Sequence, residues 1–155
     1  MKLKHLVALL CFAAVAALGA VHGNFAGTWV FNPAKSKNVG MMAQMKIVET
    51  IEQSGTALDV TNHTSFQGRD DESRTHYDLT GTPATNETPM GGPAQTVSKW
   101  QGSKLVTIWT SESAVAGGPK VVRTETRSLS PDGRTMTVES VRASNPAMVM
   151  VFEKK

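Results

Sequence analysis

Short runs of alternating apolar and polar residues, separated by proline and glycine, set the strongest limit on how this chain folds. Alternation with a period of two places successive side chains on opposite faces of a β-strand. All seven prolines fall between these runs, where no backbone N–H is needed for a ladder. The pattern predicts about nine strands, at residues 24–31, 44–53, 57–66, 73–80, 95–100, 104–113, 120–129, 134–143 and 147–153.

The links between these strands are mostly of hairpin length, and no segment has a convincing helical period. Sequential hairpins favour an up-and-down antiparallel sheet, and closure into a barrel removes the two exposed edges of that sheet. We therefore expect an all-β fold, an up-and-down antiparallel β-barrel of about 8–10 strands. The alternative is a β-sandwich. The longest predicted loop, residues 81–94, contains three prolines and three glycines, and loops of this length are often functional.

The first 23 residues have the pattern of a secretory signal peptide. Lys2 and Lys4 precede an apolar run at residues 6–18, and small residues follow at 19–23. This apolar run is too short for a transmembrane helix. Cleavage after Ala20 or after Gly23 fits the small residue required there, and we favour Gly23. Residues 24–155 then form one exported domain, which is periplasmic or extracellular and has no transmembrane segment.

Removal of this leader changes the charge and the redox chemistry of the chain. The full sequence has 16 basic and 13 acidic residues. Without Lys2 and Lys4 it keeps 14 basic against 13 acidic residues, so the net charge falls from +3 to +1. A nearly neutral domain without a basic cluster is not expected to bind nucleic acid. The single cysteine, Cys11, leaves with the leader, so the domain depends on its core rather than on disulfides.

Two stretches resemble a known group of proteins. Phe25-Ala26-Gly27-Thr28-Trp29 is similar to the G-x-W opening strand of lipocalins and related calycins, which include fatty-acid-binding proteins and avidins. Residues 27–36 and the hairpin at 129–138 resemble small exported bacterial proteins of the lipocalin-like type. The resemblance implies a barrel whose interior holds a small ligand.

The same resemblance implies an arginine from a late strand packed over Trp29, and Arg127 and Arg142 are the two candidates. The chain departs from the group in two ways. It lacks the mid-chain Thr-Asp-Tyr motif of lipocalins, and its first connection is too short for the helix pair of fatty-acid-binding proteins.

The candidate ligand-binding residues are aromatic and basic. Trp100 and Trp109 flank one predicted hairpin, where they either line a cavity or belong to an ordinary core or an interface patch. On the strand at 120–129, Arg123 and Arg127 share one face. If that face points inward, the guanidinium groups can hold a ligand carboxylate, and if it points outward, they belong to a solvated row of charges. Tyr77 completes the set.

No pattern of residues indicates catalysis, a cofactor or a bound metal. His63 and His76 lie on neighbouring predicted strands, but without the spacing of metal ligands. Residues 69–72 are expected to form a turn rather than a calcium loop. We therefore expect a non-catalytic protein that carries a small apolar or amphipathic ligand. The alternative is an interaction or inhibitor module whose barrel is filled by side chains and whose protein partner is unknown.

Overall fold

The computed structural model describes residues 21–89, 91–143 and 145–155, so most of the predicted leader lies outside the described residues. Two short 3-10 helices and ten strands follow one another along the chain. The elements are β1 (Gly27–Phe31), η1 (Pro33–Lys35), η2 (Gly40–Gln44), β2 (Lys46–Gln53), β3 (Ala57–Phe66), β4 (Arg69–Asp78), β5 (Ala84–Glu87), β6 (Pro93–Gln101), β7 (Lys104–Ser111), β8 (Val121–Leu129), β9 (Thr135–Arg142) and β10 (Met148–Lys154).

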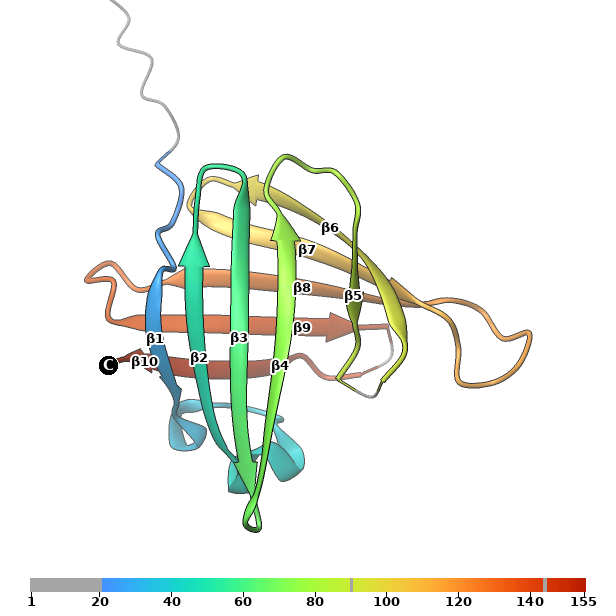
Figure 1. Cartoon of the computed structure of the whole chain (residues 1–155), viewed down its shortest axis with the longest axis horizontal. Coiled ribbons are helices and arrows are strands. Elements are labelled where there is room, and N and C mark those ends of the chain that lie inside the picture. Colours follow the sequence, from blue (N-terminus) through green and yellow to red (C-terminus); the bar gives the residue numbers. More distant parts are fainter. Residues whose placement is uncertain (1–20, 90, 144) are drawn as a thin grey trace, which may run out of the picture.

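The ten strands form one antiparallel sheet in the order β4-β3-β2-β1-β10-β9-β8-β7-β6-β5. Only the pairing of β1 with β10 joins strands that are distant in the sequence. Figure 1 shows the sheet wrapped on itself, with β1–β4 crossing β6–β10 at a steep angle. The predicted up-and-down barrel is confirmed, and its single continuous sheet excludes the β-sandwich. Among the described residues, no helix is long and apolar enough to cross a membrane.

Three details of the sequence prediction were wrong. Residues 84–87 form strand β5 inside the segment predicted as a loop. The prediction missed this strand because four residues are too few for alternation to be recognised. Pro93 is the first residue of β6, where its missing N–H is tolerated. The turn after β3 consists only of Gln67 and Gly68, both with positive φ. Consequently β4 begins at Arg69, and residues 69–72 are strand rather than turn.

The antiparallel order gives the barrel two distinct ends. The mouth end carries η1, η2 and the β3–β4, β5–β6, β7–β8 and β9–β10 connections, and the closed end carries the residues before β1 and the other connections. The closed end is apolar, since Phe25, Trp29 and Phe152 are completely buried there. The Trp29 indole donates a hydrogen bond of 2.7 Å to the carbonyl of Phe25. Trp29 is therefore a central residue of the core.

The cation over Trp29 is a lysine. Lys154 Nζ lies 5.2 Å from the centre of the Trp29 ring, in the position that the family resemblance gave to Arg127 or Arg142. Both arginines lie elsewhere: Arg127 lies over Tyr77 in the interior, and Arg142 is exposed at the end of β9. The correction follows from the register, which pairs Trp29 with Lys154 across β1 and β10.

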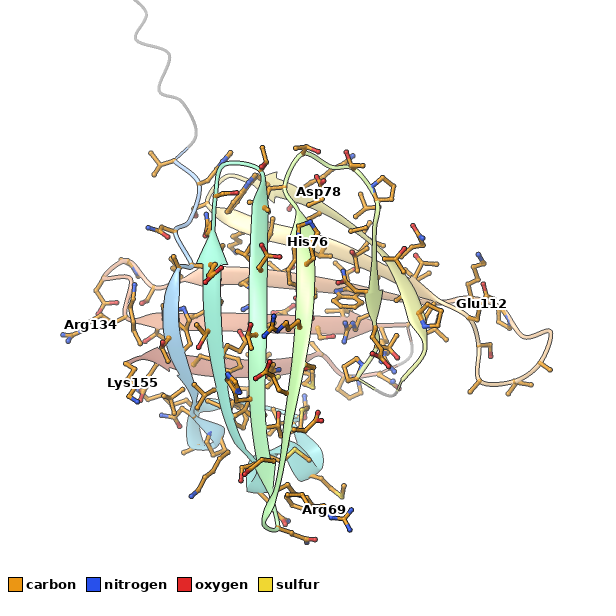
Figure 2. All side chains as sticks on the ribbon, viewed as in Figure 1. Arg69, His76, Asp78, Glu112, Arg134 and Lys155 are labelled. Atoms are coloured by element: carbon orange, nitrogen blue, oxygen red, sulfur yellow. The ribbon has the colours of Figure 1, made fainter. Side chains whose placement is uncertain are left out.

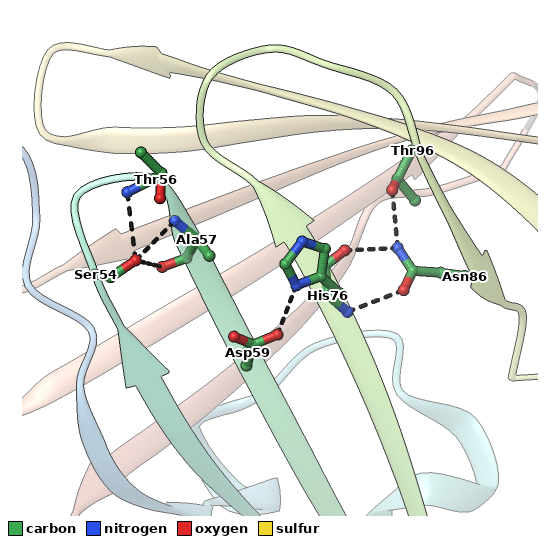
Figure 3. A network of polar contacts seen from close by, with 7 residues as sticks. All are labelled: Ser54, Thr56, Ala57, Asp59, His76, Asn86 and Thr96. Atoms are coloured by element: carbon green, nitrogen blue, oxygen red, sulfur yellow. Dashed lines mark hydrogen bonds and ion pairs between the residues drawn. The ribbon is translucent and has the colours of Figure 1, made fainter.

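A side chain closes the seam between β4 and β5, the two strands that end the sheet order. Asn86 on β5 accepts a hydrogen bond from the His76 backbone N–H (2.9 Å) and donates to the His76 carbonyl (2.8 Å). It also donates to Thr96 Oγ1 at 2.8 Å (Figure 3). The amide group of Asn86 thus pairs with β4 as a neighbouring backbone would. Its buried position makes these bonds hard for water to replace.

Replacement of Asn86 by alanine should therefore lower the free energy of unfolding by about 1–3 kcal/mol, because buried partners lose their hydrogen bonds. Chemical denaturation measures this loss. Gln95→Ala is a matched control, since Gln95 is exposed and makes one hydrogen bond to Thr85. The control should change stability by less than about 0.5 kcal/mol. Equal effects of both substitutions would contradict the role given to Asn86.

Candidate functional site

The charged face of β8 points into the barrel. Arg127 and Glu125 are 3% and 8% exposed, whereas the sequence left the direction of this face open. The neighbouring strands explain this orientation, because Arg127 pairs with buried Leu105 on β7 and buried Val138 on β9. Several other charged side chains lie outside this interior. Figure 2 shows Arg69, Glu112 and Arg134 at the ends of strands and in loops, where all three are exposed.

An ionic belt crosses the middle of the barrel; we define it as Glu49, Tyr77, Arg123, Glu125 and Arg127. Arg127 Nη1 lies 2.7 Å from Glu49 Oε2, which joins β8 to β2. The Tyr77 hydroxyl donates to Glu125 Oε1 at 2.9 Å. Glu125 lies 3.8 Å from Arg127 Nη2 and 3.7 Å from Arg123 Nη2, so it faces both guanidinium groups.

Glu49 is the belt residue that the sequence analysis missed. It lies on the inner face of β2 between Ile47 and Ile51, which are both buried. A carboxylate on an otherwise apolar face was the available signal, because buried glutamates almost always have a charged or hydrogen-bonding partner. The identity of that partner was not visible, since Arg127 lies 78 residues away along the chain.

Burial and charge act together on the pKa values of Tyr77 and Arg127. Burial alone would lower the pKa of Arg127, but the nearby Glu49, Tyr77 and Glu125 hold it above its ordinary value. Burial raises the pKa of Tyr77 well above its ordinary value of 10.0, and the charge of Glu125 raises it further. Arg127 is therefore a permanent cation, and Tyr77 is a neutral hydrogen-bond donor.

A small pocket opens beside the belt at the mouth end. It has a volume of about 20 Å³, and Trp109, Arg123 and Arg142 are among its lining residues. The Arg123 guanidinium lies 4.4 Å from the centre of the Trp109 ring, as expected for a cation–π contact. Trp109 is 5% exposed. Within the described residues its Nε1 has no hydrogen-bond partner, and neither does Arg127 Nε or Asn62 Oδ1.

Methionines surround the apolar part of the mouth end. Met148 and Met150 lie on the inner face of β10, where they pair with Ser140 and Val138. Met42 and Met45 come from η2 and the residue that follows it. All four are partly buried and pack against the core. Methionine side chains are flexible and adapt to irregular contacts, so this end can rearrange more easily than the closed end.

Four of the five predicted site residues come together, and one does not. The four that meet in the interior are Tyr77, Trp109, Arg123 and Arg127. The ring centres of Tyr77 and Trp109 are 6.1 Å apart in an edge contact. Trp100 lies at the closed end and stacks on His22 and Phe25. Trp100 and Trp109 are separated because their hairpin spans the length of the barrel. Whether these residues bind a ligand stays a prediction.

The two histidines do not form a common site. His63 faces Glu72, and His76 Nδ1 lies 2.6 Å from Asp59 Oδ1 on the outer face of the sheet. Asp59 and His76 border a polar groove of about 420 Å³ beside Asn86 (Figure 3). In the part of the chain that the structure describes, no three histidine, cysteine or acidic side chains are placed to hold a metal ion.

Comparison with solved structures connects this barrel to a known fold. The sequence matches no family model and no curated protein. Fatty-acid-binding protein 1 of Echinococcus granulosus superposes with a TM-score of 0.66 at 13% identity, over 84% of this chain and 96% of that one. The REP1-NXSQ fatty acid transporter gives 0.64 at 15% identity, over 84% and 95%. The fluorescent protein UnaG, as its N57A mutant, gives 0.63 at 15% identity, over 84% and 96%.

The chain has a calycin-type fold. At these levels of identity the likeness establishes the barrel alone. The sequence resemblance assigned a pair of helices in the first connection to fatty-acid-binding proteins. In this chain the connection between β1 and β2 contains two short 3-10 helices instead. The up-and-down topology nevertheless determines the strand order of this barrel and which connections lie at its mouth end.

Tyr77 gives a direct test of the belt, because it is the only tyrosine in the chain. In the unfolded chain it loses its proton near pH 10.0, whereas in the folded barrel its pKa is raised. The stability contributed by the buried phenol is therefore complete below pH 10.0 and falls as the pH rises above it. Absorbance of tyrosinate should appear only as the barrel unfolds.

The Tyr77→Phe variant is the control for other titrating groups. The difference in free energy of unfolding between the wild type and this variant should be constant at neutral pH and shrink above pH 10.0. Ionisation of Tyr77 near its ordinary pKa in the folded protein would show that the belt is open to water.

Proposed function

We propose that this protein binds a small apolar or amphipathic molecule at the mouth end of its barrel, without catalysis. The observation that carries the proposal is Trp109, a buried indole whose Nε1 has no partner within the described residues and which borders the mouth pocket. A buried unpaired donor costs free energy unless another group accepts its hydrogen bond. A ligand hydroxyl, carbonyl or carboxyl oxygen would supply that acceptor.

The fold and the mouth methionines support the same proposal. Two of the structural neighbours are described as a fatty-acid-binding protein and a fatty acid transporter. The mouth pocket of about 20 Å³ is far smaller than the ~300–1,000 Å³ typical of ligand sites. Binding therefore requires side chains at the mouth end to move, and the partly buried Met42, Met45, Met148 and Met150 lie at that end. Their flexible side chains can then cover an apolar tail.

Removal of the indole N–H tests the proposal. The Trp109→Phe variant keeps an aromatic ring but loses the donor, so its affinity for dodecanol should fall on the order of tenfold. Titration calorimetry measures the affinity, and denaturation should show a stability change below about 1.5 kcal/mol. Trp100→Phe, at the closed end, is the matched control and should bind dodecanol as the wild type does.

An interaction module is the second candidate, and the small pocket is the observation that favours it. If neither dodecanol nor dodecanoic acid binds the wild type, the barrel interior is a filled core. The outer surface would then carry the function, through contact with a protein partner. If Trp109→Phe and Trp100→Phe lower the affinity for dodecanol equally, both tryptophans likewise belong to the core.

We also propose that the protein is exported. The basic residues, apolar run and small residues of the first 23 positions support a cleavable leader. Of the two cleavage points, the contacts of His22 and Gly23 favour the one after Ala20. His22 stacks on Trp100 with ring centres 4.4 Å apart, and the Gly23 carbonyl accepts a 2.9 Å hydrogen bond from Gln53.

The mass of the mature protein decides between the two cleavage points. Expression of the full chain in a bacterium, followed by fractionation and mass spectrometry, should give a periplasmic or secreted product that begins at Val21. A product that begins at Asn24 would place the cleavage after Gly23 instead. A cytoplasmic product with all 155 residues would refute export.

A further inference from the structure

We infer that Glu125, together with Glu49, acts as a built-in counter-charge that makes the barrel selective for uncharged ligands over carboxylic acids. The inference rests on the proposed function and specifies its ligand class. It follows from the charge balance of the ionic belt, from the position of Glu125 and from the cost of a second carboxylate.

The belt is electrically balanced. Its two cations, Arg123 and Arg127, are matched by two carboxylates, Glu49 and Glu125, and the side chains of all four are at most 12% exposed. Tyr77 is neutral because burial and Glu125 raise its pKa. Arg142 also borders the mouth pocket, but it is exposed. Water and salt screen the charge of an exposed group strongly.

Glu125 occupies the place where the donors of the belt converge. Its Oε1 accepts the Tyr77 hydrogen bond and faces Arg127, and its Oε2 faces Arg123. These three groups are the phenol and guanidinium donors that would recognise a ligand carboxylate. An acid that entered from the mouth would find this position filled by a side chain of the same charge.

The penalty for a second carboxylate falls on charged ligands alone. In a partly dry interior, like charges repel much more strongly than in water, and the incoming acid must also lose its hydration. A hydroxyl or carbonyl group has no net charge and can accept the Trp109 N–H without this repulsion. The belt therefore discriminates by charge, while the methionines and Trp109 contact the rest of the ligand.

Paired ligands and an isosteric substitution test the inference. Dodecanol and dodecanoic acid differ in their charged group at neutral pH, and titration calorimetry measures both. The wild type should bind the alcohol on the order of tenfold more tightly than the acid. Glu125→Gln keeps an acceptor for Tyr77 but removes the charge, so it should bring the acid to at least the affinity of the alcohol.

Glu139→Gln is the matched control, because Glu139 is exposed on the outer face of β9. It should leave both affinities unchanged. If Glu125→Gln does not fold, Glu49→Gln is tested instead. This variant also removes one buried carboxylate, while Arg127 keeps Glu125 as a partner. A wild type that prefers the acid, or a Gln variant that strengthens both ligands equally, would overturn the inference.

A second measurement separates this inference from the proposed function. Acetate has no tail, so its binding does not depend on a ligand cavity. Titration of acetate should shift the Nε–H resonances of Arg123 or Arg127 in Glu125→Gln and leave them in place in the wild type. Absence of any shift in the variant, or equal shifts in both proteins, would refute the counter-charge. Failure of dodecanol to bind the wild type refutes only the proposed function.

Discussion

The contact between Arg127 and Glu49 joins opposite sides of the barrel at its middle. It joins β8 to β2 across the interior at 2.7 Å, between two side chains that are almost completely buried. A charge placed there without a partner would cost several kcal/mol, about 3–5 when one member of such a pair is removed. The positions of Glu125 and Tyr77 follow from the same requirement, since they surround the remaining face of the guanidinium group.

This requirement divides the interior into zones with different properties. The closed end is packed with large apolar side chains around Trp29 and Phe152, and its polar atoms, such as the Trp29 indole N–H, have partners. Between the belt and the mouth, the interior is instead lined by methionines and by the Trp109 indole, whose N–H has no partner among the described residues. Stability is thus concentrated at one end, and adaptability at the other. Such a division suits a binding site, because well-packed regions resist rearrangement.

The sequence predicted the strands well because alternation is a local signal. The buried face of a strand can be identified without knowledge of its neighbours from its alternating apolar residues, such as Ile47 and Ile51, or Leu58 and Val60. The same reasoning left the direction of β8 open, because Arg123, Glu125 and Arg127 alternate there with Thr124 and Thr126. Neither face is apolar, so its direction depends on pairing with Leu105 and Val138. Contacts such as Arg127 with Glu49, or Asn86 with His76, are set by the closed topology and leave no local trace.

The seam between β4 and β5 gives this barrel an uneven mechanical character. Among the described residues, nine backbone ladders hold the sheet together, whereas the hydrogen bonds between β4 and β5 come from the amide of Asn86. Opening this seam breaks a few side-chain bonds and leaves every ladder intact. Among the lines between neighbouring strands, this seam is therefore the one where the fewest hydrogen bonds must break for the strands to separate. Local opening at such a seam requires less free energy than global unfolding, so the two need not occur together.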